Sequence, residues 1–179
     1  MGTETELKLS LAAEDIPRLI QHPLLATAPR RLKLHNTYFD TAELALTQKK
    51  VAVRERRVLR KTLLTVKTAH RSEGGISHRS EWEAPTTPGS FDFSTLIDDA
   101  ALVESLSQIA PQLVPIFTTD FSRRFWTLDF RRAKIEVALD LGTVRVQRDD
   151  LTREQPICEL ELELKEGNPT TLFALARLL

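Results

Sequence analysis

The chain contains a single cysteine, Cys158, which excludes an internal disulfide and fits a reducing compartment. Net charge is also absent, because 25 lysine and arginine residues balance 25 aspartate and glutamate residues. This balance excludes the broad positive field of nonspecific nucleic-acid binding, so we expect no nucleic-acid partner. No apolar run approaches membrane-spanning length, and the acidic N-terminus lacks the basic start of a signal peptide. We therefore expect a cytoplasmic protein with no membrane partner.

The length of 179 residues suffices for one domain with a sizeable core and gives no reason to expect two. The segment 84–90, rich in proline and glycine, is the best candidate for a domain boundary. Strand-like alternation resumes after this segment, so we interpret it as a loop. The sequence therefore predicts a single domain over residues 1–179.

Strict alternation of charged and apolar side chains marks the two ends of the chain. The charged positions are Glu4, Glu6 and Lys8 near the start, and Glu159, Glu161, Glu163 and Lys165 near the end. A period of two places each set on one face of a β-strand, with leucines on the opposite face. Taken alone, either strand is typical of an antiparallel sheet whose charged face lies in water. The alternative is that both acidic faces line a shared cavity.

The stretches between these two strands also favour β-structure. We predict strands at 31–40, 50–57, 62–68, 77–83, 116–130, 134–141 and 143–148, and helices from Ala13 to about His22, at 93–106 and after Pro169. A glycine turn at 72–75 joins two of the strands, and Gly142 is expected to turn the chain between the last two. Eight or nine strands with short connections predict an α+β, mainly β fold, an eight-stranded antiparallel barrel with a few flanking helices.

Positive charge gathers on the middle strands. Arg54 and Arg56 share one face of their strand, Lys67 lies on the next, and Arg79 is aligned with Glu81. Charges that face bulk water have little reason to sort by strand, because exposed ion pairs contribute little to stability. A lining of this kind needs water, metal and an anion to offset the burial of charge. Carboxylates suit hard divalent cations and arginines suit phosphate, so the sequence indicates an oligophosphate ligand.

The order of these motifs resembles the CYTH superfamily, the triphosphate tunnel metalloenzymes. Glu4-Thr5-Glu6-Leu7-Lys8 matches its ExExK signature, and the later matches are 38–41, Arg54 with Arg56, Lys67, Arg79 with Glu81, 119–123, 136–140 and 159–163. Within it, 117–121 and 156–164 are most similar to bacterial inorganic triphosphatases, which often carry a C-terminal helical CHAD domain. No such domain precedes Leu179, and the unfinished last helix favours the N-terminal part of a longer CYTH-CHAD protein over a natural single-domain one.

The resemblance implies metal-dependent hydrolysis of inorganic tripolyphosphate to pyrophosphate and phosphate inside the barrel, with Mg²⁺ or Mn²⁺ as cofactor. The implied metal ligands are Glu4, Glu6, Glu161 and Glu163, and the implied substrate-binding residues are Lys8, Arg54, Arg56, Lys67, Arg79 and Arg123. Lys67 would stabilise the leaving phosphate, and a second metal, or a carboxylate such as Glu159 or Glu163, would orient the attacking water. The imperfect period of 116–130 leaves open whether Arg123 or Arg124 faces inward.

Several alternatives share this lining. Glu81, Glu136 and Asp140 are as well explained by a structural role as by contact with the arginines. The substrate is tripolyphosphate or another small molecule that contains a triphosphate, so thiamine triphosphatase, nucleoside triphosphatase and class IV-type adenylyl cyclase remain alternatives. A noncatalytic module that binds polyphosphate is the alternative from another functional class.

Overall fold

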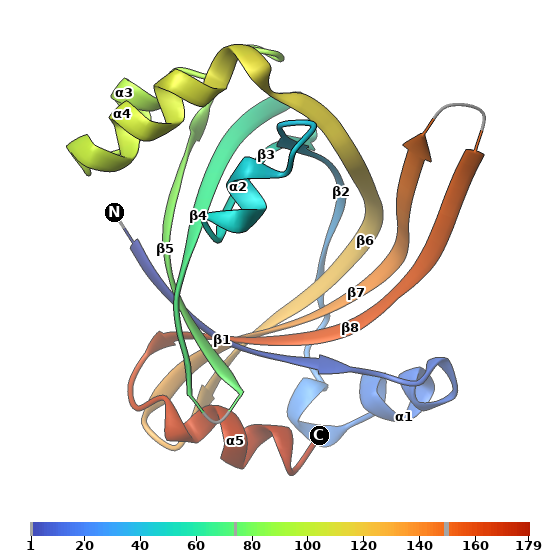
Figure 1. The fold of residues 1–179 in the computed structure, drawn as a ribbon. Helices are drawn as coiled ribbons and strands as arrows, with labels where there is room; N and C mark the ends of the chain where they lie inside the picture. Colours follow the sequence, from blue (N-terminus) through green and yellow to red (C-terminus); the bar gives the residue numbers. More distant parts are fainter. Residues whose placement is uncertain (1, 74, 149–150) are drawn as a thin grey trace.

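The computed structural model describes residues 2–73, 75–148 and 151–179. In these ranges eight antiparallel strands close into a barrel, which confirms the predicted architecture (Figure 1). The strands are β1 (Gly2–Ser10), β2 (Arg30–Asp40), β3 (Val51–Val58), β4 (Lys61–Glu73), β5 (Ile76–Pro85), β6 (Val114–Phe130), β7 (Ala133–Arg148) and β8 (Leu151–Glu166). Their order around the barrel is β1-β5-β4-β3-β2-β6-β7-β8. Strand β1 closes the barrel because it pairs with β5 along its first half and with β8 along its second.

Short helices flank the barrel. They are α1 (Ile16–Ile20), α2 (Ala45–Gln48), α3 (Phe93–Leu96), α4 (Ala100–Ile109) and α5 (Thr170–Ala176), with 3-10 turns at Ala13–Asp15, Pro23–Leu25 and Ala110–Gln112. Figure 1 shows α3 and α4 at one side of the barrel, with α1 and α5 at the other. No helix in the described part of the chain is long and apolar enough to cross a membrane.

The hydrophobic cores lie between the outer face of the barrel and these helices. One core packs Leu172 and Leu175 of α5 against strand residues such as Leu7 and Leu162. The other packs Phe93 and Leu106 of the α3–α4 region against β3, β4 and β5. On most strands the apolar face packs against these outer cores, so the charged face points inward, whereas β2 and part of β6 turn apolar side chains such as Leu34 and Phe121 to the interior. The alternation in the sequence therefore describes a barrel with a polar interior.

Gly142 does not turn the chain, so the prediction of separate strands at 134–141 and 143–148 was wrong. Strand β7 runs through it without interruption, and Gly142 lies opposite Phe121 of β6. A Cβ atom on Gly142 would lie 2.1 Å from the carbonyl oxygen of Asp120 and 2.4 Å from Cβ of Phe121. The glycine permits a close approach of the two strands rather than a reversal of direction.

Replacement of Gly142 by Ala should lower the free energy of unfolding by about 3 kcal/mol or more, because the new methyl group meets backbone and would force the strands apart. Gly89→Ala is the matched control. Gly89 has a positive φ of 80° but open space around it, so its substitution should cost only about 1 kcal/mol. Urea denaturation of the two variants makes the comparison, and equal losses would contradict the close-approach explanation.

The predicted helix at 93–106 was wrong in its continuity, since the segment forms two helices, α3 and α4. Ile97 between them is extended, with φ of −108° and ψ of 134°. Asp99 then caps α4 by accepting a hydrogen bond from the backbone N–H of Leu102. Asp98 accepts another from the indole of Trp82, which lies beneath the break. The side chains of Asp98 and Asp99 bind these donors in place of a continuous helix, and the helix is therefore interrupted between α3 and α4.

The terminal acidic strand is longer than its alternating part, because β8 begins at Leu151 and includes Pro156. The predicted turn at 72–75 joins β4 and β5, although Gly74 lies outside the described residues. Gly75 has φ of 95°, which suits a tight reversal.

Candidate active site inside the barrel

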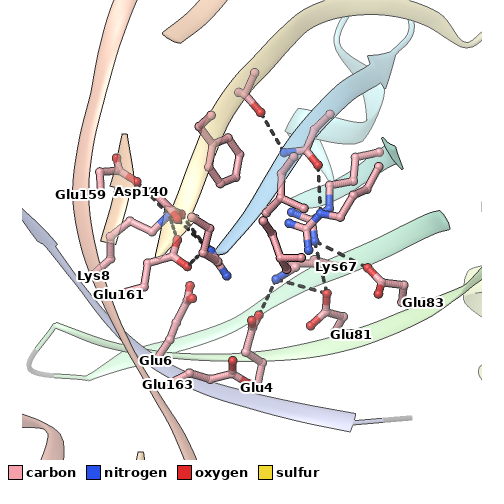
Figure 2. Close-up of a pocket in the computed structure, with 18 of the residues that line it drawn as sticks. Glu4, Glu6, Lys8, Lys67, Glu81, Glu83, Asp140, Glu159, Glu161 and Glu163 are labelled. Atoms are coloured by element: carbon pink, nitrogen blue, oxygen red, sulfur yellow. Dashed lines mark hydrogen bonds and ion pairs between the residues drawn. The ribbon is translucent and has the colours of Figure 1, made fainter. Parts of the chain in front are cut away.

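The inner faces of the strands enclose a cavity of about 760 Å³. Its wall carries nine carboxylates and seven cationic side chains from seven strands (Figure 2). They are Glu4, Glu6, Glu81, Glu83, Glu136, Asp140, Glu159, Glu161 and Glu163, and Lys8, Arg54, Arg56, Lys67, Arg79, Arg123 and Lys165. Such a density of charge in an enclosed space is typical of a binding site for ionic ligands.

Every residue predicted to bind metal or substrate, or to act in catalysis, lies on this wall. Their roles remain predictions, whereas their convergence is a structural fact. The sequence left open whether Arg123 or Arg124 of β6 faces inward. Arg123 lines the cavity and Arg124 does not. Phe121 and Phe125 of the same strand line the cavity as well, so the odd positions face inward over this part of β6.

Arg123 is the centre of an ion-pair network at the acidic side of the cavity. Its Nε and Nη2 donate to the two carboxylate oxygens of Asp140 over 2.8 and 2.6 Å. Nη2 also donates to Glu161, which in turn pairs with Nζ of Lys8 over 2.6 Å. Asp140 is thus a direct partner of an arginine, as one of the sequence alternatives proposed. Glu161 is the carboxylate that links Arg123 with Lys8.

Burial by itself would raise the pKa of Glu161, but the charges of Arg123 and Lys8 outweigh it and lower the pKa to about 2. A carboxylate whose pKa is depressed by folding stabilises the protein above its unfolded pKa of 4.5, and this stabilisation is lost as pH falls towards 2. Glu161→Gln should therefore lower the free energy of unfolding by on the order of 2 kcal/mol at pH 7.

Urea denaturation in metal-free buffer at pH 7 and pH 3 tests this prediction. The difference between wild type and Glu161→Gln should shrink at the lower pH. Glu166→Gln on the same strand is the control, since that side chain is 72% exposed. A difference for Glu161→Gln that does not change with pH would show that the charge of Glu161 is not what stabilises the barrel.

Glu6 and Glu163 are carboxylates whose charge is poorly compensated. Burial raises the pKa of Glu6, and the charges of Glu4 and Glu161 raise it further. The cation paired with Glu6 is Arg79, at a distance of 3.8 Å. Burial likewise raises the pKa of Glu163, despite its 2.6 Å pair with Lys165. An added cation would relieve the electrostatic cost at both positions.

These carboxylates suit a hard divalent cation by their chemistry. Glu4, Glu6, Glu161 and Glu163 offer oxygen ligands only, which is the donor set that Mg²⁺ and Mn²⁺ prefer. In the described part of the chain no three His, Cys, Asp or Glu side chains already converge in a metal-holding arrangement. Glu4 and Glu161 instead point at Lys67 and Lys8 (Figure 2). The residues therefore fit a metal ion if these carboxylates exchange a lysine for the ion.

Arg54 and Lys67 lie on the other side of the cavity, beside two carboxylates of β5. Nζ of Lys67 lies 2.6 Å from Glu4 and 3.3 Å from Glu81. Arg54 contacts Glu81 and Glu83 only at 3.6 and 3.8 Å. Its side chain is buried, and its Nε atom finds no hydrogen-bond partner among the described residues. A buried donor without an acceptor is costly, so Arg54 is poised to receive an anionic ligand.

Arg56 has no carboxylate within ion-pair distance in the part of the chain that the structure describes. Burial lowers the pKa of Arg56, and the positive charge of Arg54 adds to the effect, bringing it to about 10. The guanidinium is fixed by one neutral group, the side-chain amide of Asn36, over 3.0 Å. Arg54 and Arg56 together form the electropositive part of the wall, which a polyanion would neutralise.

Four polar members of the wall were assigned no role from the sequence: Asn36, Glu83, Thr119 and Lys165. Parity along the strands could have found them. Asn36 shares the face of Tyr38, Thr119 that of Arg123, Glu83 that of Glu81, and Lys165 that of Glu163. Asn36 and Thr119 were passed over because they are uncharged. Glu83 and Lys165 are charged, but each lies just beyond a recognised motif, the first after Arg79 with Glu81 and the second after 159–163.

One part of the wall is apolar. Leu32 and Leu34 of β2 lie beside Phe121 and Phe125 of β6, and Val58 of β3 lies opposite Leu34. Leu34 and Phe121 are buried. An inorganic ligand has no use for such a surface, whereas an organic group attached to a phosphate chain could pack on it.

Solved structures with a similar fold come from several organisms. A candidate adenylyl cyclase from Hippeastrum, described as having a dominant triphosphatase activity, superposes with a TM-score of 0.61 at 19% identity, covering 97% of this chain and 84% of that one. A candidate adenylate cyclase from Bacillus halodurans gives 0.60 at 18% identity, covering 99% and 88%. At these identities the likeness establishes the fold alone.

Sequence comparison reaches further. A protein named inorganic triphosphatase from Haemophilus influenzae is 35% identical over an alignment of 179 positions, which covers 97% of this chain. The chain spans about half of that relative, since the match covers 48% of its length. The sequence pattern of the CYTH domain matches residues 2–179. This match covers the barrel, its flanking helices and the whole charged wall, and the chain therefore belongs to the CYTH family.

Proposed function

We propose that this domain hydrolyses inorganic tripolyphosphate to pyrophosphate and phosphate in the cavity of the barrel, with Mg²⁺ or Mn²⁺ as cofactor. The observation that carries the proposal is the pair Arg54 and Arg56 in the same cavity as a cluster of undercompensated carboxylates: Arg54 comes no closer than 3.6 Å to a carboxylate of the described residues, and Arg56 forms no ion pair with them. The name of the Haemophilus influenzae relative supports the same reaction. Residues 1–179 act in this proposal as one catalytic domain, and a neighbouring CHAD domain in a longer protein stays a prediction.

The phosphate chain would lie along the cationic residues. Arg54 and Arg56 present planar guanidinium groups, which bind phosphate oxygens in pairs of parallel hydrogen bonds. Arg79 is only weakly held by Glu6, at 3.8 Å, and is free to turn to a phosphate. Lys8 and Arg123 are paired with carboxylates on the metal-binding side of the cavity. They would therefore bind the end of the phosphate chain that lies nearest the metal.

The metal would be held by Glu4, Glu6, Glu161 and Glu163. When bound, a divalent cation supplies neutralisation of phosphate oxygens and lowers the pKa of a bound water. Glu163 or Glu159 would accept the proton of the attacking water and orient its lone pair towards phosphorus. Glu159 suits this role because its one ion pair in the described part of the chain is with Lys8, at 3.2 Å, and its side chain is 39% exposed.

Lys67 would stabilise the leaving phosphate. Its ammonium lies between Glu4 and Glu81, at 2.6 and 3.3 Å, so it borders both the metal-binding carboxylates and the arginine pair. Negative charge builds up on the leaving oxygen as the phosphoanhydride bond breaks, and a nearby ammonium group lowers the energy of this transition state.

An assay of phosphate release with and without divalent metal tests the proposal. Tripolyphosphate, ATP and thiamine triphosphate are compared at equal concentration, with cyclic AMP measured as the product of a cyclase. We expect tripolyphosphate to be the best substrate, with release abolished by a chelator. Tight binding of tripolyphosphate without metal and without turnover would instead indicate a noncatalytic polyphosphate-binding module.

An organic triphosphate is the second candidate substrate, because of the apolar wall at Leu32, Leu34, Phe121 and Phe125. Packing of a nucleoside or thiamine group on this wall would make that substrate better than tripolyphosphate. The same assay separates the two candidates. If the organic triphosphate is the better substrate, Phe125→Ala should weaken the binding of that substrate and leave the binding of tripolyphosphate unchanged.

A further inference from the structure

Three residues on neighbouring strands form one row across the wall of the cavity. In the strand register, Asn36 of β2 lies opposite Arg56 of β3 on one side and opposite Thr119 of β6 on the other. Asn36 is only 1% exposed and Thr119 only 7% exposed, so water does not compete for their hydrogen bonds. The row therefore couples the arginine to a buried polar network.

The hydrogen bonds in this row have a fixed direction. Nε of Arg56 can only donate, so the group that faces it over 3.0 Å must be the amide oxygen of Asn36. The amide nitrogen of Asn36 then points the other way and donates to Oγ1 of Thr119 over 2.8 Å. Thr119 thus determines which way the Asn36 amide faces. Without an acceptor at position 119, the amide would be free to rotate and to present its N–H₂ group to the arginine.

The bond to Nε leaves the phosphate-binding end of Arg56 free. The two terminal nitrogens form no ion pair or hydrogen bond with the described residues. A guanidinium held through Nε keeps these nitrogens as a fork, the geometry that suits two oxygens of one phosphate. A neutral holder also keeps the full positive charge available, whereas a carboxylate would neutralise it.

Arg123 shows the contrast within the same cavity. Its Nε and Nη2 are both engaged by Asp140, and Glu161 takes a further bond from Nη2. Arg56 has an amide where Arg123 has carboxylates. A long side chain loses rotamer entropy when it is ordered by a ligand, and an arginine that is already ordered avoids part of this loss.

We propose that Asn36 and Thr119 are positioning residues, which hold the Arg56 guanidinium with its fork open towards a phosphate group of the substrate. This inference rests on the proposed function, because it takes Arg56 as a phosphate-binding residue. Two uncharged residues, Asn36 and Thr119, would thus hold in place the arginine whose charge is least compensated by the described residues.

The test compares Thr119→Val with Thr119→Ser by calorimetric titration of tripolyphosphate in metal-free buffer. Valine has nearly the shape of threonine but no acceptor, whereas serine keeps the hydroxyl. We expect Thr119→Val to raise Kd about fivefold, the effect of one lost hydrogen bond, and Thr119→Ser to stay within about twofold of wild type. Asn36→Asp should raise Kd more than Thr119→Val, because a carboxylate would neutralise Arg56.

A double-mutant cycle with Arg56→Met separates positioning from a general structural effect. If Thr119 acts through Arg56, Thr119→Val should change Kd by less than about twofold once Arg56 is replaced. The inference is overturned if Thr119→Val and Thr119→Ser behave alike, or if the Thr119→Val effect is unchanged in the Arg56→Met background. Failure of the wild type to bind tripolyphosphate, or an Arg56→Met variant with unaltered Kd, would instead overturn the proposed function and this inference with it.

Discussion

Glu6→Gln should make the protein more stable and almost inactive. Burial, together with the charges of Glu4 and Glu161, raises the pKa of Glu6 above its ordinary value of 4.5. A carboxylate with a raised folded pKa stabilises the fold only when protonated, and this contribution is lost as pH rises through the folded pKa. At pH 7 the charged Glu6 side chain therefore opposes folding, and the neutral glutamine removes that cost.

The same substitution removes a proposed metal ligand, so kcat/KM for tripolyphosphate should fall by about a hundredfold or more. Thermal unfolding in a chelator and phosphate release in Mg²⁺ give the two readings on one protein. Glu166→Gln, at a side chain 72% exposed and outside the cavity, should change neither. A Glu6→Gln protein that is less stable than wild type at pH 7, or fully active, would contradict this explanation.

The gain in stability should itself depend on pH. Below about pH 4.5 the wild-type carboxylate becomes protonated in both states, so the difference between wild type and Glu6→Gln should diminish. This is the reverse of the expectation for Glu161, whose pKa is lowered and whose charge stabilises the fold. The two glutamates on neighbouring strands β1 and β8 thus act on stability with opposite sign.

Arg54→Met should weaken tripolyphosphate binding by about a hundredfold, the effect expected for loss of a buried, charge-assisted contact. Methionine fills much of the arginine volume, and the substitution removes a buried Nε that has no hydrogen-bond partner within 2–73, 75–148 and 151–179. The unfolding midpoint without ligand should therefore change little, while the loss of affinity is large.

Arg57→Met is the matched control, because Arg57 is the same residue type on the same strand but is exposed outside the cavity. Calorimetric titration of tripolyphosphate into each variant gives the comparison. Equal affinities of Arg54→Met and Arg57→Met would show that the cavity face of β3 is not the phosphate site. A large loss of stability in Arg54→Met alone would mean that Arg54 holds the barrel together instead.

Much of the fold was predictable because its strands alternate strictly. Every second residue is charged over 4–8 of β1 and 159–165 of β8, so parity alone places Glu4, Glu6 and Lys8 on one face of β1, and Glu161 and Glu163 on one face of β8. Parity failed at Gly142, where the sequence shows a glycine but not the close approach of β6 that requires it. The helical period also failed at 97–99, where Asp98 accepts a hydrogen bond from Trp82 and Asp99 caps the start of a second helix.

The candidate site was predictable in its charged residues and not in its connections. The sequence motif marks Arg56, but its holder Asn36 lies 20 positions before it, and Thr119 lies 83 positions after Asn36. Which strands become neighbours decides such contacts. Strand β3 follows β2 along the chain, whereas β6 pairs with β2 across the long segment between them. The choice between Arg123 and Arg124 needed the same information, because it depends on the register of β6 against β7.

The most direct test of the central claim is a crystal structure of the protein grown with tripolyphosphate and Mn²⁺, with anomalous data collected for manganese. We predict phosphate density bound to Arg54 and Arg56, and manganese peaks beside Glu6, Glu161 and Glu163, all within the same cavity. Manganese and phosphate bound outside the barrel, or a cavity filled only by water at saturating ligand, would contradict a triphosphate site inside it.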